Sequence, residues 1–80
     1  MFFVYVISSV NHKYIYVGLT QNLNVRISQH NSGKEKTTNP YRPFVLILTE
    51  KYSTRLEARK REKQLKSGSG KEWLKKEFGL

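Results

Sequence analysis

The feature that most constrains the fold is a pair of β-rich runs at the start of the chain. The runs are Phe3–Ile7 and Tyr14–Gly18, and residues 8–13 between them are mostly of turn-forming types. Two such runs joined by a short turn predict an antiparallel β-hairpin. The first run is apolar at nearly every position, which is typical of a strand covered on both faces, so we expect it at the centre of the sheet.

Each run of the hairpin carries a tyrosine at its centre. If the hairpin pairs about Val10 and Asn11, Tyr5 and Tyr16 lie directly opposite each other on one face, with Cβ atoms about 4.5–5.5 Å apart. A slip of one residue would send the two side chains to opposite faces. A buried strand tyrosine more often packs than reacts, so the register decides whether these two can act together.

The whole chain predicts one α+β domain over residues 1–80, a three-stranded antiparallel sheet flanked by helices in the order ββαβαα. After the hairpin we expect a helix from Thr20 or Asn22 to about His30, a long loop over 31–43, a strand over 44–50, a helix over 54–67 with a capping box at Thr54 and Glu57, and a last short helix with a second box at Ser69 and Glu72.

Composition narrows the possible chemistry. The 80 residues include no cysteine, which excludes disulfides and thiolate zinc sites, and His12 and His30 are too few for a histidine metal cage. No apolar run approaches the roughly 20 residues that cross a bilayer, and the first residues do not resemble a signal peptide. We therefore expect a cytoplasmic protein that uses neither a membrane nor a small-molecule organic cofactor.

The net charge of +9 indicates an anionic partner. Residues 51–80 hold ten of the fifteen basic residues and four of the six acidic ones. Nucleic acid is favoured over an acidic membrane surface, because the basic helices have no broad apolar face free to insert. The alternative is a solvated surface that only keeps the protein soluble.

Glu62 breaks the pattern of its helix. Ala58, Glu62 and Leu65 fall on the stripe that should face the core, where a carboxylate is exceptional. One interpretation is an ion pair with a nearby Arg or Lys; the other is an inward-facing metal ligand or acid–base group. All six acids are Glu, so a bound divalent cation would have one carboxylate, with water and substrate phosphate completing its shell.

Arg26 and His30 form an i, i+4 pair on the first helix. Such a pair usually lies on a solvated face. Here the helix directly follows the Tyr16 strand, so its first turns lie near the end of that strand. The guanidinium of arginine is planar, permanently charged and suited to a phosphate.

Taken together, these residues resemble the paired motif of the GIY-YIG nuclease superfamily. Val4-Tyr5-Val6 and Tyr16-Val17-Gly18 match the two halves of the motif, although Val4 stands where the first half has a glycine. The similarity is greatest to small, single-domain members related to the N-terminal domain of the excision-repair endonuclease C subunit. The pattern continues through Thr20, Asn22, Leu23, Arg26, His30, Asn31, Gly33, Glu57, Ala58, Arg61, Glu62, Leu65 and Lys66.

The resemblance implies hydrolysis of a DNA phosphodiester with one metal ion. By analogy, Tyr16 assists or acts as general base toward water, and Tyr5 positions that water or the phosphate. Arg26 stabilises the charge that develops, and His30 contacts the phosphate or assists proton transfer. Glu62 holds Mg²⁺ or Mn²⁺. Tyr5 and Tyr16 must then share a face, and that face must look toward Arg26 and Glu62. Many members have a later asparagine that this chain does not match; Trp73 and Leu74 occupy that region.

We therefore expect a metal-dependent DNA endonuclease. We expect its substrate to be branched or otherwise structured DNA and its task to lie in DNA repair or recombination. One alternative is a nucleic-acid-binding module without catalysis, and another is a protein adaptor anchored by Trp73 and Phe78. The sequence leaves the oligomeric state open. The residues expected to contact DNA phosphates are Lys34, Lys36, Arg42, Arg59, Lys60 and Lys63.

Overall fold

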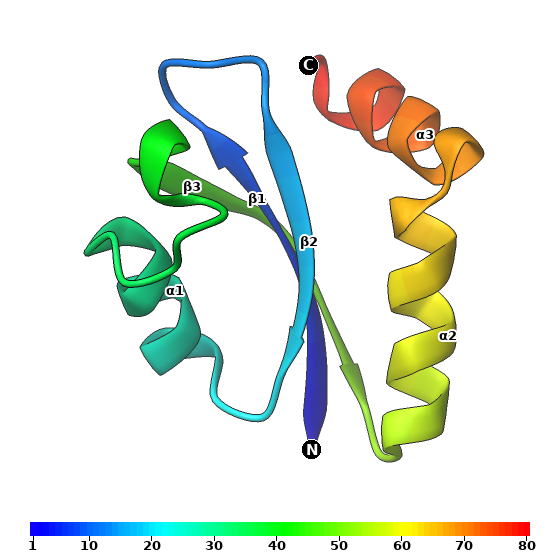
Figure 1. The fold of residues 1–80 in the computed structure, drawn as a ribbon. Coiled ribbons are helices and arrows are strands. Elements are labelled where there is room, and N and C mark those ends of the chain that lie inside the picture. Colours follow the sequence, from blue (N-terminus) through cyan, green and yellow to red (C-terminus); the bar gives the residue numbers. More distant parts are fainter.

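A computed structural model describes residues 1–80 and shows the expected α+β order (Figure 1). No helix in it has the length and apolarity needed to span a membrane. The elements are β1 (Phe2–Ser9), β2 (Ile15–Thr20), α1 (Leu23–Asn31), a 3₁₀ turn (Asn39–Tyr41), β3 (Phe44–Tyr52), α2 (Arg55–Lys66) and α3 (Gly68–Phe78).

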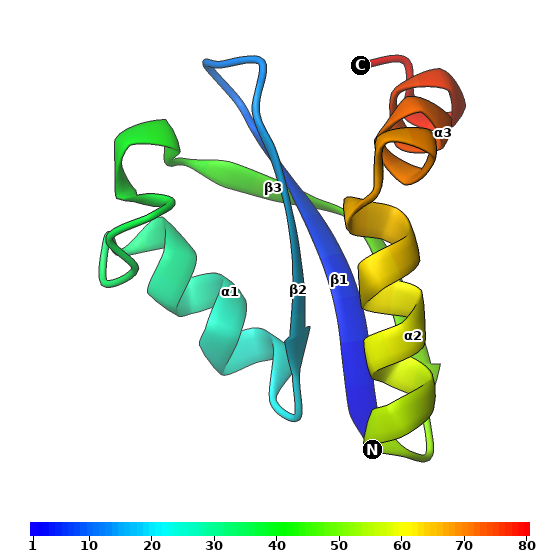
Figure 2. The same ribbon diagram turned by 45° about the vertical axis from the view of Figure 1, so that its right-hand side comes forward.

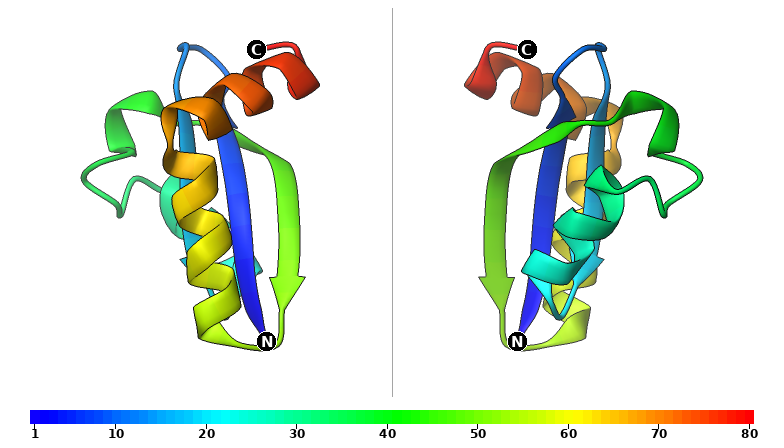
Figure 3. Two further views of the ribbon diagram at one scale, coloured as in Figure 1. Left: turned by 90° about the vertical axis from the view of Figure 1, so that its right-hand side faces the viewer. Right: turned by 90° about the vertical axis from the view of Figure 1, so that its left-hand side faces the viewer.

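The three strands form one antiparallel sheet in the order β2-β1-β3, with helices on both faces. β1 lies at the centre, as its continuous apolarity predicted. In Figures 1 and 2, α1 lies on one side of the sheet and α2 on the other. The views in Figure 3 show α2 across one face and α1 across the opposite face.

Each face of the sheet has its own apolar core. On the α2 side, Val4, Val6 and Val17 pack with Leu65 and Leu74. On the α1 side the buried members are Tyr5, Ile7 and Phe44, with Tyr14, Tyr16, Leu23, Ile27 and Tyr41 packed against them. Alternation along β1 and β2 thus separates an aliphatic face from a face we call the tyrosine face.

The register of the hairpin differs from the prediction by two residues. Tyr5 pairs with Gly18, and Tyr16 pairs with Ile7, so the expectation that the tyrosines lie directly opposite each other was wrong. The turn lies one residue later in the chain than expected, because Ser8 pairs with Ile15. A shift of two residues keeps each side chain on its face. The two tyrosine rings therefore still share a face, with centroids 6.3 Å apart.

Side-chain caps begin all three α-helices, and one of them differs from the prediction. Asn22 caps α1 and Thr54 caps α2, both as expected. The cap of α3 is Ser67 and not Ser69: its hydroxyl accepts a hydrogen bond from the Gly70 backbone N–H at 3.1 Å. Helix α3 therefore begins directly after α2.

Candidate functional site

A chain of three buried polar groups crosses the tyrosine face. The Tyr5 hydroxyl lies 2.8 Å from Nε2 of His30, and Nδ1 of His30 lies 2.8 Å from Oγ1 of Thr38. All three residues are fully buried. Tyr5 and His30 were both predicted site residues, and the structure adds Thr38 from the long loop, which was not predicted.

The protonation of this chain follows from burial. Burial lowers the pKa of His30, and the charge of Arg26 lowers it further, so the imidazole is neutral at pH 7. Burial also raises the pKa of Tyr5 to about 12, against the opposing effect of the Arg26 guanidinium. Tyr5 is therefore a phenol at neutral pH, and its hydroxyl is committed to His30 instead of facing solvent.

Tyr16 is the tyrosine that remains available to a ligand. It lies on β2 at the edge of the sheet, is half-buried, and makes no side-chain hydrogen bond within the protein. Its ring packs 4.9 Å from the imidazole of His30, measured between centroids. The buried Tyr5–His30 pair thus supports the ring of Tyr16, whose hydroxyl is free to meet water or substrate.

Arg26 joins the tyrosine face and brings an acidic partner with it. Burial lowers the pKa of Arg26, but hydrogen bonds with Glu35 and Tyr5 outweigh this effect and raise it. Its guanidinium forms an ion pair with Glu35 and donates to the Gln29 side chain at 3.1 Å. The same pairing lowers the pKa of Glu35. Glu35 was not predicted here, and nothing in its sequence neighbourhood distinguishes it.

Gly18 explains why the second motif ends in glycine. It is the cross-strand partner of Tyr5, and a Cβ at this position would overlap the Tyr5 ring and hydroxyl. The Tyr5 side chain therefore reaches His30 by passing directly over the Gly18 backbone. The absence of a side chain on β2 is what opens this path.

The long loop is packed against the tyrosine face. The Tyr41 ring stacks on Tyr14 with centroids 4.0 Å apart, and the hydroxyl of Ser9 donates to the Tyr41 carbonyl. These contacts anchor the 3₁₀ turn that follows Thr38. The loop thus delivers both Glu35 and Thr38 to the tyrosine face.

Glu62 is buried as predicted, but the expectation that the tyrosine face looks toward it was wrong, because its helix covers the opposite face of the sheet. Helix α2 packs on the aliphatic face, and the Glu62 side chain contacts none of the four other predicted catalytic residues through a hydrogen bond or ion pair. Its Oε1 lies 2.6 Å from Arg59, and its Oε2 lies 3.1 Å from Nζ of Lys66. The ion-pair interpretation of its out-of-pattern position is therefore confirmed, and its role as a metal ligand stays a prediction.

The donor set limits how a cation could be held. Nowhere in the structure do three His, Asp or Glu side chains gather as a metal site. A single carboxylate still suits a hydrated Mg²⁺, which keeps several waters and binds substrate phosphate. Glu62 fits that role chemically, provided that a cation exchanges with Lys66 or Arg59. Glu35 is the carboxylate on the tyrosine face, but it is already paired with Arg26.

The residues predicted to contact DNA lie on two sides of the sheet. Lys34 and Lys36 are exposed in the loop beside α1, and Lys60 and Lys63 are exposed on α2. Figure 1 shows these segments on opposite sides of the strands. The two remaining cations have internal partners: Arg42 donates to the Ser32 carbonyl at 3.1 Å, and Arg59 pairs with Glu62.

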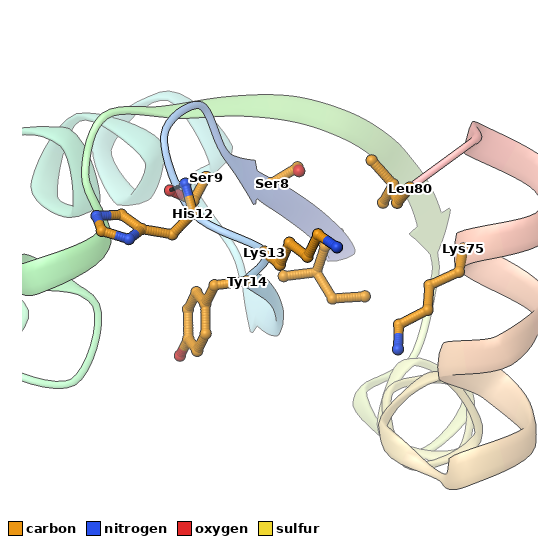
Figure 4. A pocket seen from close by; sticks show the side chains of 8 residues that line it. Ser8, Ser9, His12, Lys13, Tyr14, Lys75 and Leu80 are labelled. Carbon is orange, nitrogen blue, oxygen red and sulfur yellow. Dashed lines mark hydrogen bonds between the residues drawn. The ribbon is translucent and has the colours of Figure 1, made fainter.

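A groove lies between the hairpin tip and α3 (Figure 4). It is lined by none of the predicted catalytic residues. Lys13 and Lys75 reach toward it from its two sides. The last turn of α3, which borders it, presents its carbonyl end, where the helix dipole disfavours anions. We therefore leave this groove out of the site. Its other lining residues are Ser8, Ser9, His12, Tyr14, Ile15 and Leu80.

The predicted adaptor surface is partly present. Leu74 is fully buried in the core, whereas Trp73 and Phe78 are 42% and 37% exposed. These two rings contact each other edge to face with centroids 6.4 Å apart, and the Arg61 guanidinium lies 5.5 Å from the centre of the Trp73 ring. The two aromatic side chains therefore satisfy much of their contact area within the chain.

Known proteins resemble this chain over almost its full length. A family model described as the GIY-YIG catalytic domain matches residues 1–77. The UPF0213 protein of Staphylococcus haemolyticus is 38% identical over 74 residues, which cover 91% of this chain and 89% of the relative. A UPF0213 protein of Staphylococcus epidermidis is similar to the same extent.

A solved structure shows the same fold. The solution NMR structure of the UPF0213 protein from Bacillus halodurans is similar with a TM-score of 0.56 and 33% sequence identity. The similarity covers 92% of this chain and 82% of that one. Both the matched length and the identity show common ancestry as well as a common fold.

Proposed function

The chain belongs to the GIY-YIG family, and from this premise we propose that it is a divalent-metal-dependent endonuclease that hydrolyses phosphodiester bonds of DNA. Membership in this family of catalytic domains indicates nuclease activity on nucleic acid. The observation that carries the proposal is the convergence on one face of a free tyrosine hydroxyl, a half-buried arginine and a neutral histidine: Tyr16, Arg26 and His30.

The roles that we propose follow the surroundings of each group. Tyr16, whose hydroxyl makes no internal hydrogen bond, orients the attacking water and assists its deprotonation. Arg26 is held by its ion pair with Glu35, and its guanidinium can stabilise the charge on a phosphate in the transition state. His30 shares a hydrogen bond with the Tyr5 hydroxyl and supports the Tyr16 ring, while Tyr5 acts through His30.

We propose that Glu62 holds the metal ion, Mg²⁺ or Mn²⁺. A bound divalent cation would supply charge neutralisation at the phosphate oxygens. Its binding requires Glu62 to give up at least one of its two ion pairs, with Arg59 or Lys66. Binding of substrate phosphates to these two basic side chains would assist that exchange.

We propose DNA that is branched or otherwise structured as the substrate, and a task in DNA repair or recombination within the cytoplasm. The basic surface supports recognition of DNA by its structure and not by its sequence, because contacts from lysines to phosphates carry little sequence information. The exposed Lys34 and Lys36 adjoin the tyrosine face and would contact the backbone nearest the site. Lys60 and Lys63 would contact a strand that passes around β2 to the α2 side.

A cleavage panel tests the proposal. Flap, branched, nicked and linear DNA are incubated with Mg²⁺ or Mn²⁺ and with wild type, Tyr16→Phe or Tyr52→Phe. Tyr52 is the matched control, because its hydroxyl bonds Glu50 at 2.7 Å, away from the tyrosine face. Loss of a general acid–base group typically costs about 10²–10⁴-fold in rate, so we expect a loss of that order for Tyr16→Phe alone. Equal rates for the two variants would contradict the role of Tyr16.

A second candidate is a nucleic-acid-binding module without catalysis. The observation that favours it is the pairing of both Glu62 oxygens with cations on a face away from Tyr16. The two candidates differ at Glu62. If the chain is a nuclease, Glu62→Gln abolishes cleavage and leaves DNA affinity within about twofold. If wild type cuts no form of DNA with either metal but still binds DNA, the binding module is the better description.

A further inference from the structure

Thr38 occupies a position where a side chain ordinarily caps the backbone of the following turn. It is the N-cap residue of the 3₁₀ turn Asn39–Tyr41, and a threonine there normally accepts a hydrogen bond from the turn. Its hydroxyl makes no such bond. Instead, Oγ1 lies 2.8 Å from Nδ1 of His30, eight residues earlier in the chain, and the residue is fully buried. The hydroxyl is thus committed to the imidazole.

The backbone around Thr38 holds this hydroxyl in place. The Tyr41 N–H donates to the Thr38 carbonyl at 2.9 Å, and the Asn39 N–H donates to the Glu35 carbonyl at 2.8 Å. Beyond the turn, the Tyr41 ring stacks on Tyr14. The loop therefore presents Thr38 from a fixed position, so its bond to His30 is part of the architecture of the site.

The donors around Tyr5 determine which nitrogen of His30 carries the proton. The Arg26 guanidinium can only donate, and its positive charge acts on the Tyr5 hydroxyl. A hydroxyl turns its lone pairs toward a nearby cation, so the Tyr5 O–H points away from Arg26 and donates to Nε2. The neutral ring then carries its proton on Nδ1, which donates to Thr38 Oγ1. Every nitrogen of the ring is satisfied in this arrangement.

We propose that Thr38 is a positioning residue that fixes His30 in its Nδ1–H tautomer and so directs the Nε2 lone pair at the Tyr5 hydroxyl. The consequence for cleavage rests on the proposed function, because His30 in this orientation supports the ring of Tyr16. The tautomer itself does not depend on that function. Removing the Thr38 hydroxyl would leave Nδ1–H buried without a partner, which favours moving the proton to Nε2.

Each element packed against the imidazole contributes a group that faces it. Tyr5 lies on β1, Tyr16 on β2 and Phe44 on β3, and their ring centroids are 5.8, 4.9 and 6.1 Å from it. Arg26 on α1 and Glu35 in the loop are the charges that act on it, with opposite signs. A substitution of Thr38 alters none of these groups. A change in the tautomer of His30 would therefore result from the loss of the Thr38 hydroxyl.

The experiment is a ¹⁵N NMR measurement of the histidine ring nitrogens at pH 7.5, without metal or DNA. Four proteins are compared: wild type, Thr38→Val, Thr38→Ser and Thr37→Val. Thr38→Ser keeps the hydroxyl, and the exposed Thr37 controls for the substitution itself. The exposed His12 serves as an internal reference for an unconstrained ring. We expect His30 to be protonated at Nδ1 in all except Thr38→Val, where the proton moves to Nε2 or is shared.

The same four proteins are then assayed for cleavage. We expect Thr38→Val to lower kcat about tenfold or more with KM within twofold, and Thr38→Ser to restore it. An Nε2–H tautomer in wild type, or an unchanged Nδ1–H tautomer in Thr38→Val, would overturn the proposal. If Thr38→Val does not fold, Thr38→Ala gives the same comparison. A protein that cuts no DNA but shows the expected tautomers would overturn the proposed nuclease function and leave the assignment of Thr38 intact.

Discussion

At the scale of single residues, the tyrosine face depends on the missing side chain of Gly18 as much as on the side chains of Tyr5 and His30. The Tyr5 side chain crosses β2 only because Gly18 has no Cβ. The resulting contact to His30 buries two polar groups that satisfy each other. Small substitutions at these positions should therefore lower the stability of the fold more than the same substitutions at exposed positions.

Substitution of Gly18 by alanine tests this close approach. The added methyl group would overlap the Tyr5 ring, and overpacking of this kind costs about 1–3 kcal/mol. We expect Gly18→Ala to lower the free energy of unfolding in urea by about that amount. Gly68→Ala is the control, since a Cβ there meets nothing within 4 Å. Equal stability of the two variants would show that the Tyr5 path is not restricted by β2.

The neutral state of His30 predicts a pH dependence of stability. Its pKa is lowered in the folded protein, so the unfolded chain binds more protons below the unfolded value of about 6.5. Stability is therefore fully present above about pH 6.5 and is lost as the pH falls toward the folded pKa, at up to about 1.36 kcal/mol per pH unit. The lowered pKa values of Glu35 and Glu50 act below about pH 4.3, outside this range.

Thermal unfolding between pH 8 and pH 5 measures the effect. We expect the Tm of wild type to fall over this range and the Tm of His30→Asn to be lower at pH 8 but nearly constant. His12→Asn, which alters an exposed histidine, should follow wild type. A wild-type Tm that rises as the pH falls would contradict the neutral buried imidazole.

At the scale of elements, the junction between α2 and α3 shows how one serine can serve two helices. The Ser67 hydroxyl donates to the Gln64 carbonyl at the end of α2 at 2.6 Å and accepts from the Gly70 N–H in α3. This double use lets the two helices meet without a loop. It also places Leu74 on the aliphatic core beside Leu65.

The cap at this junction is open to a direct test. Loss of a serine N-cap typically costs about 0.5–2 kcal/mol, so Ser67→Ala should lower the free energy of unfolding by about 1 kcal/mol. Ser69→Ala changes the residue that the sequence pattern had favoured, and it should cost less than about 0.5 kcal/mol. Urea titrations of both variants distinguish the two assignments. A larger loss for Ser69→Ala would restore the original capping box.

At the scale of the whole molecule, the sheet divides the positive charge into two regions. The loop beside α1 carries Lys34 and Lys36, and α2 carries Lys60 and Lys63, on opposite faces. The tyrosine face adjoins the loop and not α2. A bound duplex centred on Tyr16 would therefore meet the loop lysines first.

Charge-matched double variants measure this asymmetry. Each contact to a duplex phosphate contributes about 0.9 to the slope of log K against log salt. We expect Lys34→Gln with Lys36→Gln to reduce the slope for DNA binding by about 1.8. Lys60→Gln with Lys63→Gln removes the same net charge and should change the slope by less than half as much. Equal reductions would show that the α2 lysines contact DNA as closely as the loop lysines do, which would contradict a duplex centred on Tyr16.

Much of the fold could be predicted from the sequence because it depends on local signals. Alternation along β1 and β2 assigns each side chain to a face, and the continuous apolarity of β1 placed it at the centre of the sheet. Asn22 and Thr54 cap their helices as local hydrogen-bond acceptors. The face shared by Tyr5 and Tyr16 was correct even though their register was off by two residues, because only odd shifts change faces.

What only the tertiary structure decided concerns groups brought together from distant parts of the chain. The loop over residues 31–43 has no periodicity from which to predict that Glu35 meets Arg26 or that Thr38 meets His30. The prediction that the face of the two tyrosines looks toward Glu62 was wrong, because helical spacing shows that Glu62 points inward but not which face of the sheet its helix covers. Local sequence thus determined which side chains share a face, and packing of the loop and of α2 decided which of them meet.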